Sequence, residues 1–328
     1  MYKTLLAAGL SLTAVPAIAD TPVLTVLTYD SFTAEWGPGP AIEKGFEATC
    51  ACDLQFVAAG DGAALLARVL LEGASSNADV VLGLDTNLTA AAADSELFAP
   101  HGQSPALTLP VAYDNPLFLP YDFGWFAFVY DNTKLSAPPT SFTELAASDL
   151  KIVIQDPRSS TPGLGLVMWV KAAHGDGAAQ IWADLADNIV TVTPGWSEAY
   201  GLFLEGEADM VLSYTTSPAY HIGAEQDASK SAALFSEGHF LQIEVAGKLA
   251  STDQSALADA FLAYLAAPAA QAIIPETNWM YPAATPPGGL PASFSTLITP
   301  AKSLLWPERD VPAIRDAAVT EWQNSLSR

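Results

Sequence analysis

The stretch TPGWSEAYGLFLEGEADMVLSYTTSPAY, residues 193–220, contains the signals that decide the fold class. A Pro-Gly turn is followed by a helical segment, a break at a glycine, a buried strand over residues 209–214 and a second helix start. Strands that run directly into helices are typical of α/β sheets, whose ligands usually sit at such junctions. Trp196, Tyr214 and Tyr220 lie at these junctions, so each is a candidate for ligand contact, with core packing as the plainer alternative.

Three helix starts with capping residues follow strands along the chain. These starts are Asp61-Gly62, Ser160-Thr161 and Thr215-Thr216-Ser217. Ser217 is expected to cap its own helix, because a hydroxyl accepts from the free backbone N–H groups and the proline after it needs no partner there. Ser160 or Thr161 is expected to do the same. Such helix ends also bind polar or anionic ligands, since their free N–H groups and the helix dipole favour negative charge.

Before this stretch, strand and helix signals alternate from residue 23 onward. The expected strands cover residues 23–30, 53–60 and 78–85, and the expected helices cover residues 40–50 and 60–73. This alternation predicts a parallel α/β sheet with right-handed crossovers. No GxGxxG follows a strand and no GxxxxGK[ST] occurs, so nothing predicts a nucleotide-phosphate loop.

A weak internal sequence repeat indicates two lobes of similar topology. Residues 70–87 and 202–217 both run from a helix end through Glu-Gly and Ala-Asp into an apolar strand and a Thr-rich helix start. The long apolar segments 123–131 and 239–249 are expected to cross between the lobes and to act as hinges. Residues 251–328 read as helices that pack back on the lobes.

Composition and the N-terminus narrow the protein class. Residues 1–19 have a lysine, an apolar run and the small-residue pattern Ala-Ile-Ala, which predicts a secretory signal cleaved after Ala19. Thirteen basic against 36 acidic residues give a net charge of −23, which disfavours nucleic acid as a partner. Cys50 and Cys52 suit a local disulfide in an oxidising compartment better than a zinc site, because only one residue separates them.

Several motifs, taken together and in order, resemble the periplasmic thiamine-binding proteins of bacterial ABC importers. They are LTYDSFTAEWGPGP, ADVVLGLD, QDPRSSTPGLGL, TVTPGWSEAYGLFL, VLSYTTSPAYH, FSEGH and NWMYP, and they span nearly the whole mature chain. The resemblance implies an α/β fold like the type II periplasmic binding proteins: two lobes of mostly parallel sheet with helices, joined by two crossing strands. The expected division is residues 1–19 as signal peptide, 20–124 as the first part of lobe 1, 125–245 as lobe 2 and 246–328 as a return segment whose helices pack on lobe 1 and the hinge.

The resemblance also implies a function and a ligand set. The protein would capture thiamine, and its phosphates, in the cleft and deliver it to a membrane permease and its ATPase, as a periplasmic monomer without catalysis, cofactor or metal. The expected ligand-binding residues are Tyr29, Asp30, Trp36, Asp61, Gly62, Ser160, Thr161, Trp196, Tyr214, Thr215, Thr216, Ser217, Tyr220 and Trp279. The aromatic rings would face the thiazolium cation. Asp30, with Asp61 second, would supply the carboxylate that a buried cation needs, and the hydroxyls would hold the pyrimidine edge or a phosphate.

Two alternatives of other classes share this scaffold. A ferric-ion or oxyanion binder could use Tyr214 and Tyr220, although iron binders of this shape usually use adjacent tyrosines. A thiamine-cleaving enzyme would need a cysteine nucleophile, but Cys50 and Cys52 fall in a connection before the second strand and export favours their pairing. The four histidines show no spacing that suggests a metal site, and no GxSxG nucleophile motif occurs.

Overall fold

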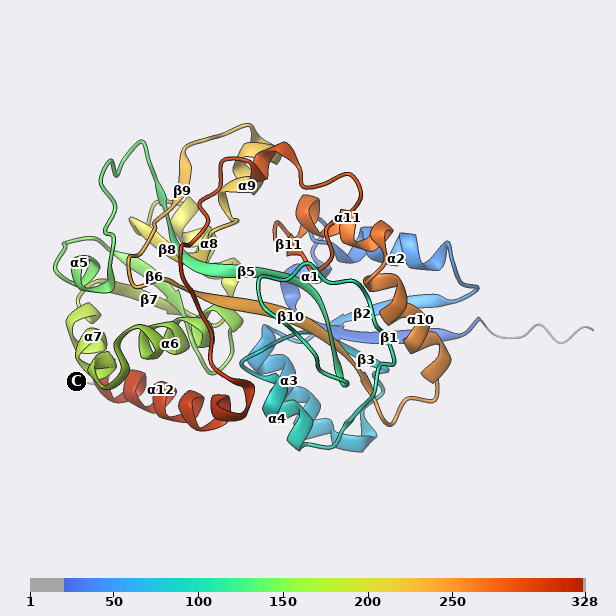
Figure 1. Ribbon diagram of the computed structural model, residues 1–328. Helices are drawn as coiled ribbons and strands as arrows, with labels where there is room; N and C mark the ends of the chain where they lie inside the picture. Colours follow the sequence, from blue (N-terminus) through green and yellow to red (C-terminus); the bar gives the residue numbers. More distant parts are fainter. Residues whose placement is uncertain (1–20, 327–328) are drawn as a thin grey trace, which may run out of the picture.

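The computed structural model describes residues 21–326 and shows one long mixed sheet with helices on both faces (Figure 1). The main strands lie in the order β2-β1-β3-β10-β5-β8-β6-β7. They are β1 Val23–Thr28, β2 Asp53–Ala58, β3 Val80–Asp85, β5 Phe118–Asp131, β6 Ile152–Gln155, β7 Ile189–Thr193, β8 Met210–Tyr214 and β10 His239–Leu249. Short strands at the sides are β4 Phe98–Ala99, β9 Lys230–Ala232, β11 Tyr281–Pro282 and β12 Ser303–Leu304.

Two parallel groups of strands form the two lobes. In lobe 1, β1 pairs in parallel with β2 and β3, and in lobe 2, β6 pairs in parallel with β7 and β8. Between them, β10 and β5 run antiparallel to each other, and each also pairs with one group. The expected two-lobed α/β fold with two crossing strands is therefore confirmed, whereas the boundaries at residues 124 and 245 stay a prediction.

The first crossing strand, β5, is longer than expected. It begins at Phe118 rather than residue 123, and so includes Pro120. Proline lacks an N–H for the ladder, and this one sits where the register against β10 shifts between Glu244 and Val245. Such irregularities are where a strand tolerates proline, and the shift places Tyr121 as the extra residue.

The helices cover the sheet in two sets that follow the lobes (Figure 1). They are α1 Asp30–Thr33, α2 Gly39–Glu47, α3 Gly62–Glu72, α4 Thr89–Asp94, α5 Phe142–Ala146, α6 Thr161–His174, α7 Ala178–Leu185, α8 Trp196–Leu204, α9 Pro218–Tyr220, α10 Ser255–Leu265, α11 Pro268–Thr277 and α12 Val311–Leu326. Helices α10 and α11 pack against α2 on lobe 1, while α8 packs beside β6, β7 and β8 on lobe 2. A π-helical turn, His221–Glu225, continues α9.

The last helix, which belongs to the return segment, contacts both lobes. Helix α12 packs mainly against α6 and α7 of lobe 2, with a smaller contact to α4 of lobe 1, and Lys171 of α6 donates to Glu321 of α12 at 2.7 Å. The buried side chains of α12 include Val311, Ala318 and Trp322. The chain reaches lobe 2 because β12 pairs with the lobe-2 end of β10, so the return segment lies on lobe 1 through α10 and α11 and mainly on lobe 2 through α12.

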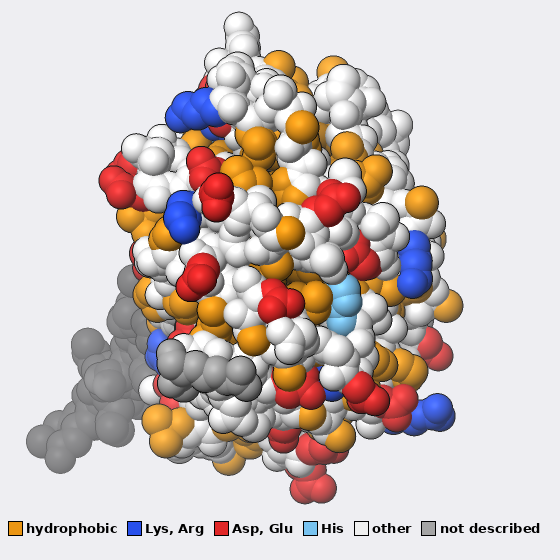
Figure 2. Space-filling view, turned by 90° about the vertical axis from the view of Figure 1, so that its left-hand side faces the viewer, with side chains coloured by type: hydrophobic (Ala, Val, Ile, Leu, Met, Phe, Trp, Pro, Cys, Tyr) orange, Lys and Arg blue, Asp and Glu red, His pale blue; other side chains and the backbone are white. Residues whose placement is uncertain are grey.

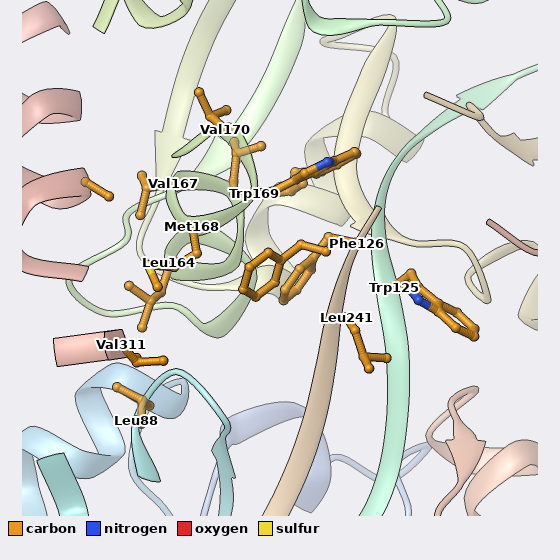
Figure 3. Packing of buried hydrophobic residues seen from close by; sticks show 14 of the residues in the cluster. Leu88, Trp125, Phe126, Leu164, Val167, Met168, Trp169, Val170, Leu241 and Val311 are labelled. Atoms are coloured by element: carbon orange, nitrogen blue, oxygen red, sulfur yellow. The ribbon is translucent and has the colours of Figure 1, made fainter. Parts of the chain in front are cut away.

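The core of lobe 2 forms where α6 lies against the crossing strands (Figure 3). Phe126 points from β5 toward α6, while neighbouring Trp125 points away from it, as alternation along a strand requires. Gly165 in α6 allows this packing, because a Cβ atom there would lie 2.0 Å from the Phe126 ring. Close approach of helix and strand at this glycine fixes where the N-terminus of α6 lies.

Four further observations concern the disulfide, the expected signal, the surface charges and the length of the apolar helices. Cys50 and Cys52 form a disulfide, with their Cα atoms 5.3 Å apart. The expected signal, residues 1–19, lies outside the described residues. On the face of lobe 2 shown in Figure 2, carboxylate side chains are widely spread and basic ones are few. Among residues 21–326 no single helix is long and apolar enough to cross a membrane; α10 with α11 passes only as a pair bent by 64°, by length and composition.

Candidate functional site

A cavity of about 270 Å³ lies between the lobes, beside the crossing strands. Ten of the expected ligand residues line it: Tyr29, Trp36, Asp61, Thr161, Trp196, Tyr214, Thr216, Ser217, Tyr220 and Trp279. Nine further residues complete the lining: Ser31, Pro162, Ser197, Tyr200, Gly201, Leu204, Glu244, Asn278 and Met280. The strand-to-helix junctions of both lobes therefore converge on one cavity, as the helix starts indicated.

Aromatic side chains of the two lobes meet in the wall of this cavity. The rings of Trp36 from lobe 1 and Trp196 from lobe 2 have centroids 6.2 Å apart. Tyr220 of lobe 2 makes an edge contact with Trp279, which follows α11, at 5.5 Å. Trp36 is 52% exposed, so this ring stands at the cavity mouth. Aromatic faces that line a cavity suit a planar and cationic ligand.

Trp196 is held in place from two sides. Its Nε1–H donates to the Ser213 hydroxyl at 2.8 Å, and its ring stacks on Tyr200, one helical turn later, at 5.0 Å. The Tyr200 hydroxyl in turn bonds His221 Nε2 at 2.9 Å. The ring is therefore positioned before any ligand arrives, which lowers the entropy cost of stacking.

A buried carboxylate, Glu244 of β10, lies in the cavity wall. Its Oε2 accepts from the hydroxyls of Tyr121 at 2.6 Å and Tyr29 at 3.1 Å, and its Oε1 accepts from Gln242 at 2.7 Å. Burial raises the pKa of Glu244 to about 7, with nearby Asp85 adding to the shift. No Lys or Arg is among the residues of 21–326 that line this cavity, so the partners of Glu244 there are hydroxyl, amide and carboxyl groups.

Asp122 of β5 supports Glu244 from behind. Asn278 donates to Asp122 Oδ2 at 2.6 Å and to the Tyr29 hydroxyl at 3.0 Å. Burial and the charge of Glu244 raise the pKa of Asp122 well above its usual range. Two carboxyl groups and two phenols thus share one hydrogen-bonded network, which a cation in the cavity would stabilise in its ionised form.

Asp30, the expected carboxylate partner, lies outside the cavity in this arrangement. Asp30 is exposed and does not line the cavity; its Oδ1 accepts from the Gly60 N–H at 2.9 Å and so fastens the turn before α3. Asp61, the second choice, does line the cavity, and burial raises its pKa to about 6. Its Oδ2 is already used by Ser160 Oγ at 2.7 Å and by the Trp196 N–H at 3.3 Å.

The capping expectations at the other helix starts also need correction. Neither Ser160 nor Ser217 caps its own helix with its side chain. The Ser217 hydroxyl accepts from the Tyr214 N–H at 3.2 Å and bonds Ser213 Oγ at 2.7 Å. Gly62, Ser160 and Thr215 do not line the cavity, because contacts between the lobes cover the first two and Thr215 is fully buried.

Sequence reasoning missed several residues that line the cavity. Tyr200 and Ser197 share the helix that begins with Trp196, so helical spacing could have suggested Tyr200 at least. Asn278 directly precedes Trp279 in the NWMYP motif. Glu244 is the one acidic residue in the crossing segment 239–249, and a lone carboxylate in a buried strand is itself a signal of function.

One group of side chains could hold a metal ion, contrary to the expectation from histidine spacing. The ligand atoms of His221, Glu225 and Asp227 lie within 4.8 Å of one another. His221 Nδ1 already bonds Glu225 at 2.6 Å, and Asp227 accepts from Ser229. Local hydrogen bonds thus account for the group, and its visible role is to hold Tyr200 through His221.

A two-lobed α/β fold with an aromatic and acidic cavity at the hinge defines a solute-binding protein. Comparison with known proteins agrees: residues 41–277 match the family model described as bacterial extracellular solute-binding protein. Relatives named thiamine-binding periplasmic protein include that of Salmonella typhimurium, 54% identical over 97% of this chain and 98% of its own length. That of Brucella melitensis is 49% identical over 95% of each chain.

Solved structures give the same picture. A periplasmic thiamin binding protein superposes with a TM-score of 0.92 at 52% identity, covering 96% of this chain and all of its own. Iron-bound HitA from Pseudomonas aeruginosa superposes with a TM-score of 0.75 at 19% identity over 93% and 99% of the two chains, a likeness of fold alone. The chain therefore belongs to the bacterial extracellular solute-binding proteins, in the branch of the thiamine-binding periplasmic proteins.

Proposed function

We propose that this protein captures thiamine, and thiamine phosphates, in the cavity between its lobes. The observation that carries the proposal is a cavity with aromatic rings from both lobes, a buried carboxylate at Glu244 and no basic side chain among the described residues that line it. Thiamine has a permanently cationic thiazolium ring, a flat aminopyrimidine and a hydroxyethyl arm. The names of the relatives support the same ligand.

Each part of the ligand finds matching chemistry in the cavity. Stacking of a desolvated cation on an aromatic face contributes about 0.5–2 kcal/mol, and Trp196 with Trp36 offers two such faces. Glu244 supplies the opposite charge that a buried cation requires. The hydroxyl and amide groups of Thr216, Ser217 and Asn278 suit the donors and acceptors of the pyrimidine edge.

A phosphate on the hydroxyethyl arm would have to bind without Lys or Arg. Thr161 and Ser197, at the N-termini of α6 and α8, line the cavity. Both helices present backbone N–H groups and the positive end of the helix dipole there, which suits an oxyanion. We therefore expect phosphate esters to be accepted at this end of the cavity.

The alternatives have less support from the site. A ferric site would need phenolates, whereas burial and the charge of Glu244 raise the pKa of Tyr214 well above its usual range. A cysteine nucleophile for thiamine cleavage would need a free thiol, whereas Cys50 and Cys52 are bonded to each other. Binding without catalysis agrees with the names of the relatives, which describe binding proteins.

The proposed setting is the periplasm, to which residues 1–19 would direct export. There the protein would work as a monomer and hand its ligand to a membrane permease driven by an ATPase. The periplasmic location given in the names of the relatives supports this setting, and the net charge of −23 disfavours nucleic acid as a further partner.

Calorimetric titration of refolded, ligand-free mature protein with thiamine tests the proposal. We expect one-to-one binding that Trp196→Ala weakens by about two- to thirtyfold, because stacking on a desolvated cation is lost. Trp196→Phe, which keeps a flat ring but not the bond to Ser213, should fall between. Leu234→Ala, at an exposed leucine outside the cavity, is the control. Absence of binding heat and of thermal stabilisation would contradict the proposal and make ferric ion and oxyanions the next ligands to test.

A further inference from the structure

The N-terminus of α3 is occupied by groups of lobe 2. The Gly62 N–H donates to Thr161 Oγ1 at 3.1 Å, and the Ala64 N–H donates to the Ser159 carbonyl at 3.0 Å. These are two of the backbone donors that a helix start leaves free. Asp61, the residue before α3, does not cap its own helix, so the partners of these donors come from across the cleft.

At α8 the roles of the lobes are reversed, since a residue of lobe 1 caps a helix of lobe 2. This helix is preceded by Gly195, which has no side chain to cap it. Asp61 of lobe 1 accepts from the first N–H of α8, at Trp196, at 3.3 Å. Its carboxylate also accepts from Ser160 at 2.7 Å, although Ser160 stands where it would ordinarily cap α6.

Gly62 makes this fit possible. A Cβ atom at this position would lie 2.2 Å from Thr161 Oγ1, a shorter separation than real side chains adopt. The φ angle of Gly62 is not in the left-handed region, so its backbone does not itself require glycine. The position excludes a side chain mainly because the other lobe closes onto it; the Gly83 carbonyl oxygen of lobe 1, 3.0 Å from the same Cβ, leaves little room on its own side.

We propose that Asp61, Gly62, Ser160 and Thr161 form a reciprocal capping clasp that holds the two lobes closed: each lobe caps a helix of the other. The caps exist only while the lobes are together, so closure over the ligand is favoured and opening leaves the starts of α3 and α8 to water. These are positioning residues for binding, and the inference rests on the proposed function. It assigns the N-terminus of α3 to the clasp rather than to the ligand.

Two variants test the clasp in the mature chain. Gly62→Ala places a methyl group in the contact, and Ser160→Ala removes one donor to Asp61; neither residue lines the cavity. Gly177→Ala is the matched control, since its nearest neighbour would lie 4.0 Å from the new Cβ. We expect Gly62→Ala to weaken thiamine binding at least tenfold and Ser160→Ala severalfold, with ligand-free melting temperatures like that of the control.

A distance measurement separates closure from affinity. Spin labels on Leu71→Cys of α3 and Ala179→Cys of α7, both exposed, report the separation of the lobes, while the paired Cys50 and Cys52 stay unlabelled. With thiamine, the control should give one narrow distance distribution and Gly62→Ala a broader one. Wild-type affinity and distances in both variants would overturn the clasp; a Gly62→Ala protein that does not fold leaves the decision to Ser160→Ala.

Failure of the proposed function gives a different result. In that case the unaltered protein does not bind thiamine, and the ligand-free distance distributions decide the clasp. A lower population of the short distance in Gly62→Ala than in Gly177→Ala would support it. Coinciding distributions in the ligand-free proteins would overturn it.

Discussion

At the residue scale, the acidic network around Glu244 is the feature that most directly selects the ligand. A carboxylate that is buried among phenols and a second carboxyl group loses hydration and gains no cation from the described part of the protein. Its pKa is raised to about 7, with burial as the main cause. A cation in the cavity would lower the pKa of Glu244 again, because opposite charge favours the ionised form.

Binding of thiamine should therefore depend on pH through Glu244. The ligand-free pKa is about 7, and a bound cation lowers it, so protonation below pH 7 competes with the ligand. Only the ionised fraction binds well, which predicts an affinity loss of about tenfold between pH 8 and pH 6. Titrations in buffers of different ionisation enthalpy should also show proton release on binding near pH 7.

Glu244→Gln isolates this effect. The variant should bind more weakly at pH 8 and lose most of the pH dependence, because the amide carries no charge. Asp94→Asn, at an exposed carboxylate, should keep the dependence of the unaltered protein. An unchanged pH profile in Glu244→Gln would transfer the effect to another group, with Asp61 as the first candidate.

At the element scale, α6 shows how packing fixes the site. Its N-terminus brings Thr161 and Pro162 to the cavity, and its position is set about one turn from that end by contact with β5. Helices pack closely where a small residue lets a neighbouring side chain approach. Here the ring of Phe126 occupies the space over Gly165, so core packing and cavity geometry are coupled through one helix.

Gly165→Ala should destabilise the protein despite the better helix propensity of alanine. A Cβ atom would lie 2.0 Å from the Phe126 ring, and overpacking of this kind typically costs about 1–3 kcal/mol. Gly201→Ala in α8 is the matched control, since nothing lies within 4 Å of its added Cβ. That variant should gain about 0.5–1 kcal/mol. Urea unfolding measures both, and equal stability of the two variants would contradict the packing account.

At the scale of the whole molecule, the two lobes share their sheet rather than being joined by loops alone. Strands β5 and β10 pair with each other over seven residues from each strand and continue into both lobes. Neither lobe can lose its sheet without exposing strands of the other. Helix α12 adds to this coupling, since the chain leaves lobe 1 and ends on lobe 2.

Unfolding should accordingly be one cooperative transition that thiamine shifts as a whole. A ligand at 100 times its dissociation constant stabilises the native state by about 2.7 kcal/mol, which raises the melting temperature by on the order of 5 °C for a protein of this size. Differential scanning calorimetry with and without thiamine measures this. Two transitions, with only one moved by the ligand, would show that the lobes unfold separately.

Much of the site was readable from local patterns. Ten of the fourteen expected residues line the cavity. Short segments such as GWSEAY and YTTSPAY show where a helix begins after a strand, and such helix starts contribute to the cavity. The pairing of Cys50 with Cys52 followed from spacing and compartment. Glu244 was missed because a single carboxylate in an apolar strand does not show which neighbours it will face.

The sequence by itself determined the α/β class, the two crossing strands and three aromatic residues of the cavity, Trp196, Tyr214 and Tyr220, since each depends on periodicity and on neighbours a few residues away. The resemblance to a known family added Tyr29, Trp36 and Trp279. The tertiary structure decided which carboxylates line the cavity and that α12 packs mainly on lobe 2. It also decided that Asp61 and Ser160, 99 residues apart, bond each other instead of capping their own helices. Such partners depend on how the two lobes close, and the sequence near each residue does not specify that geometry.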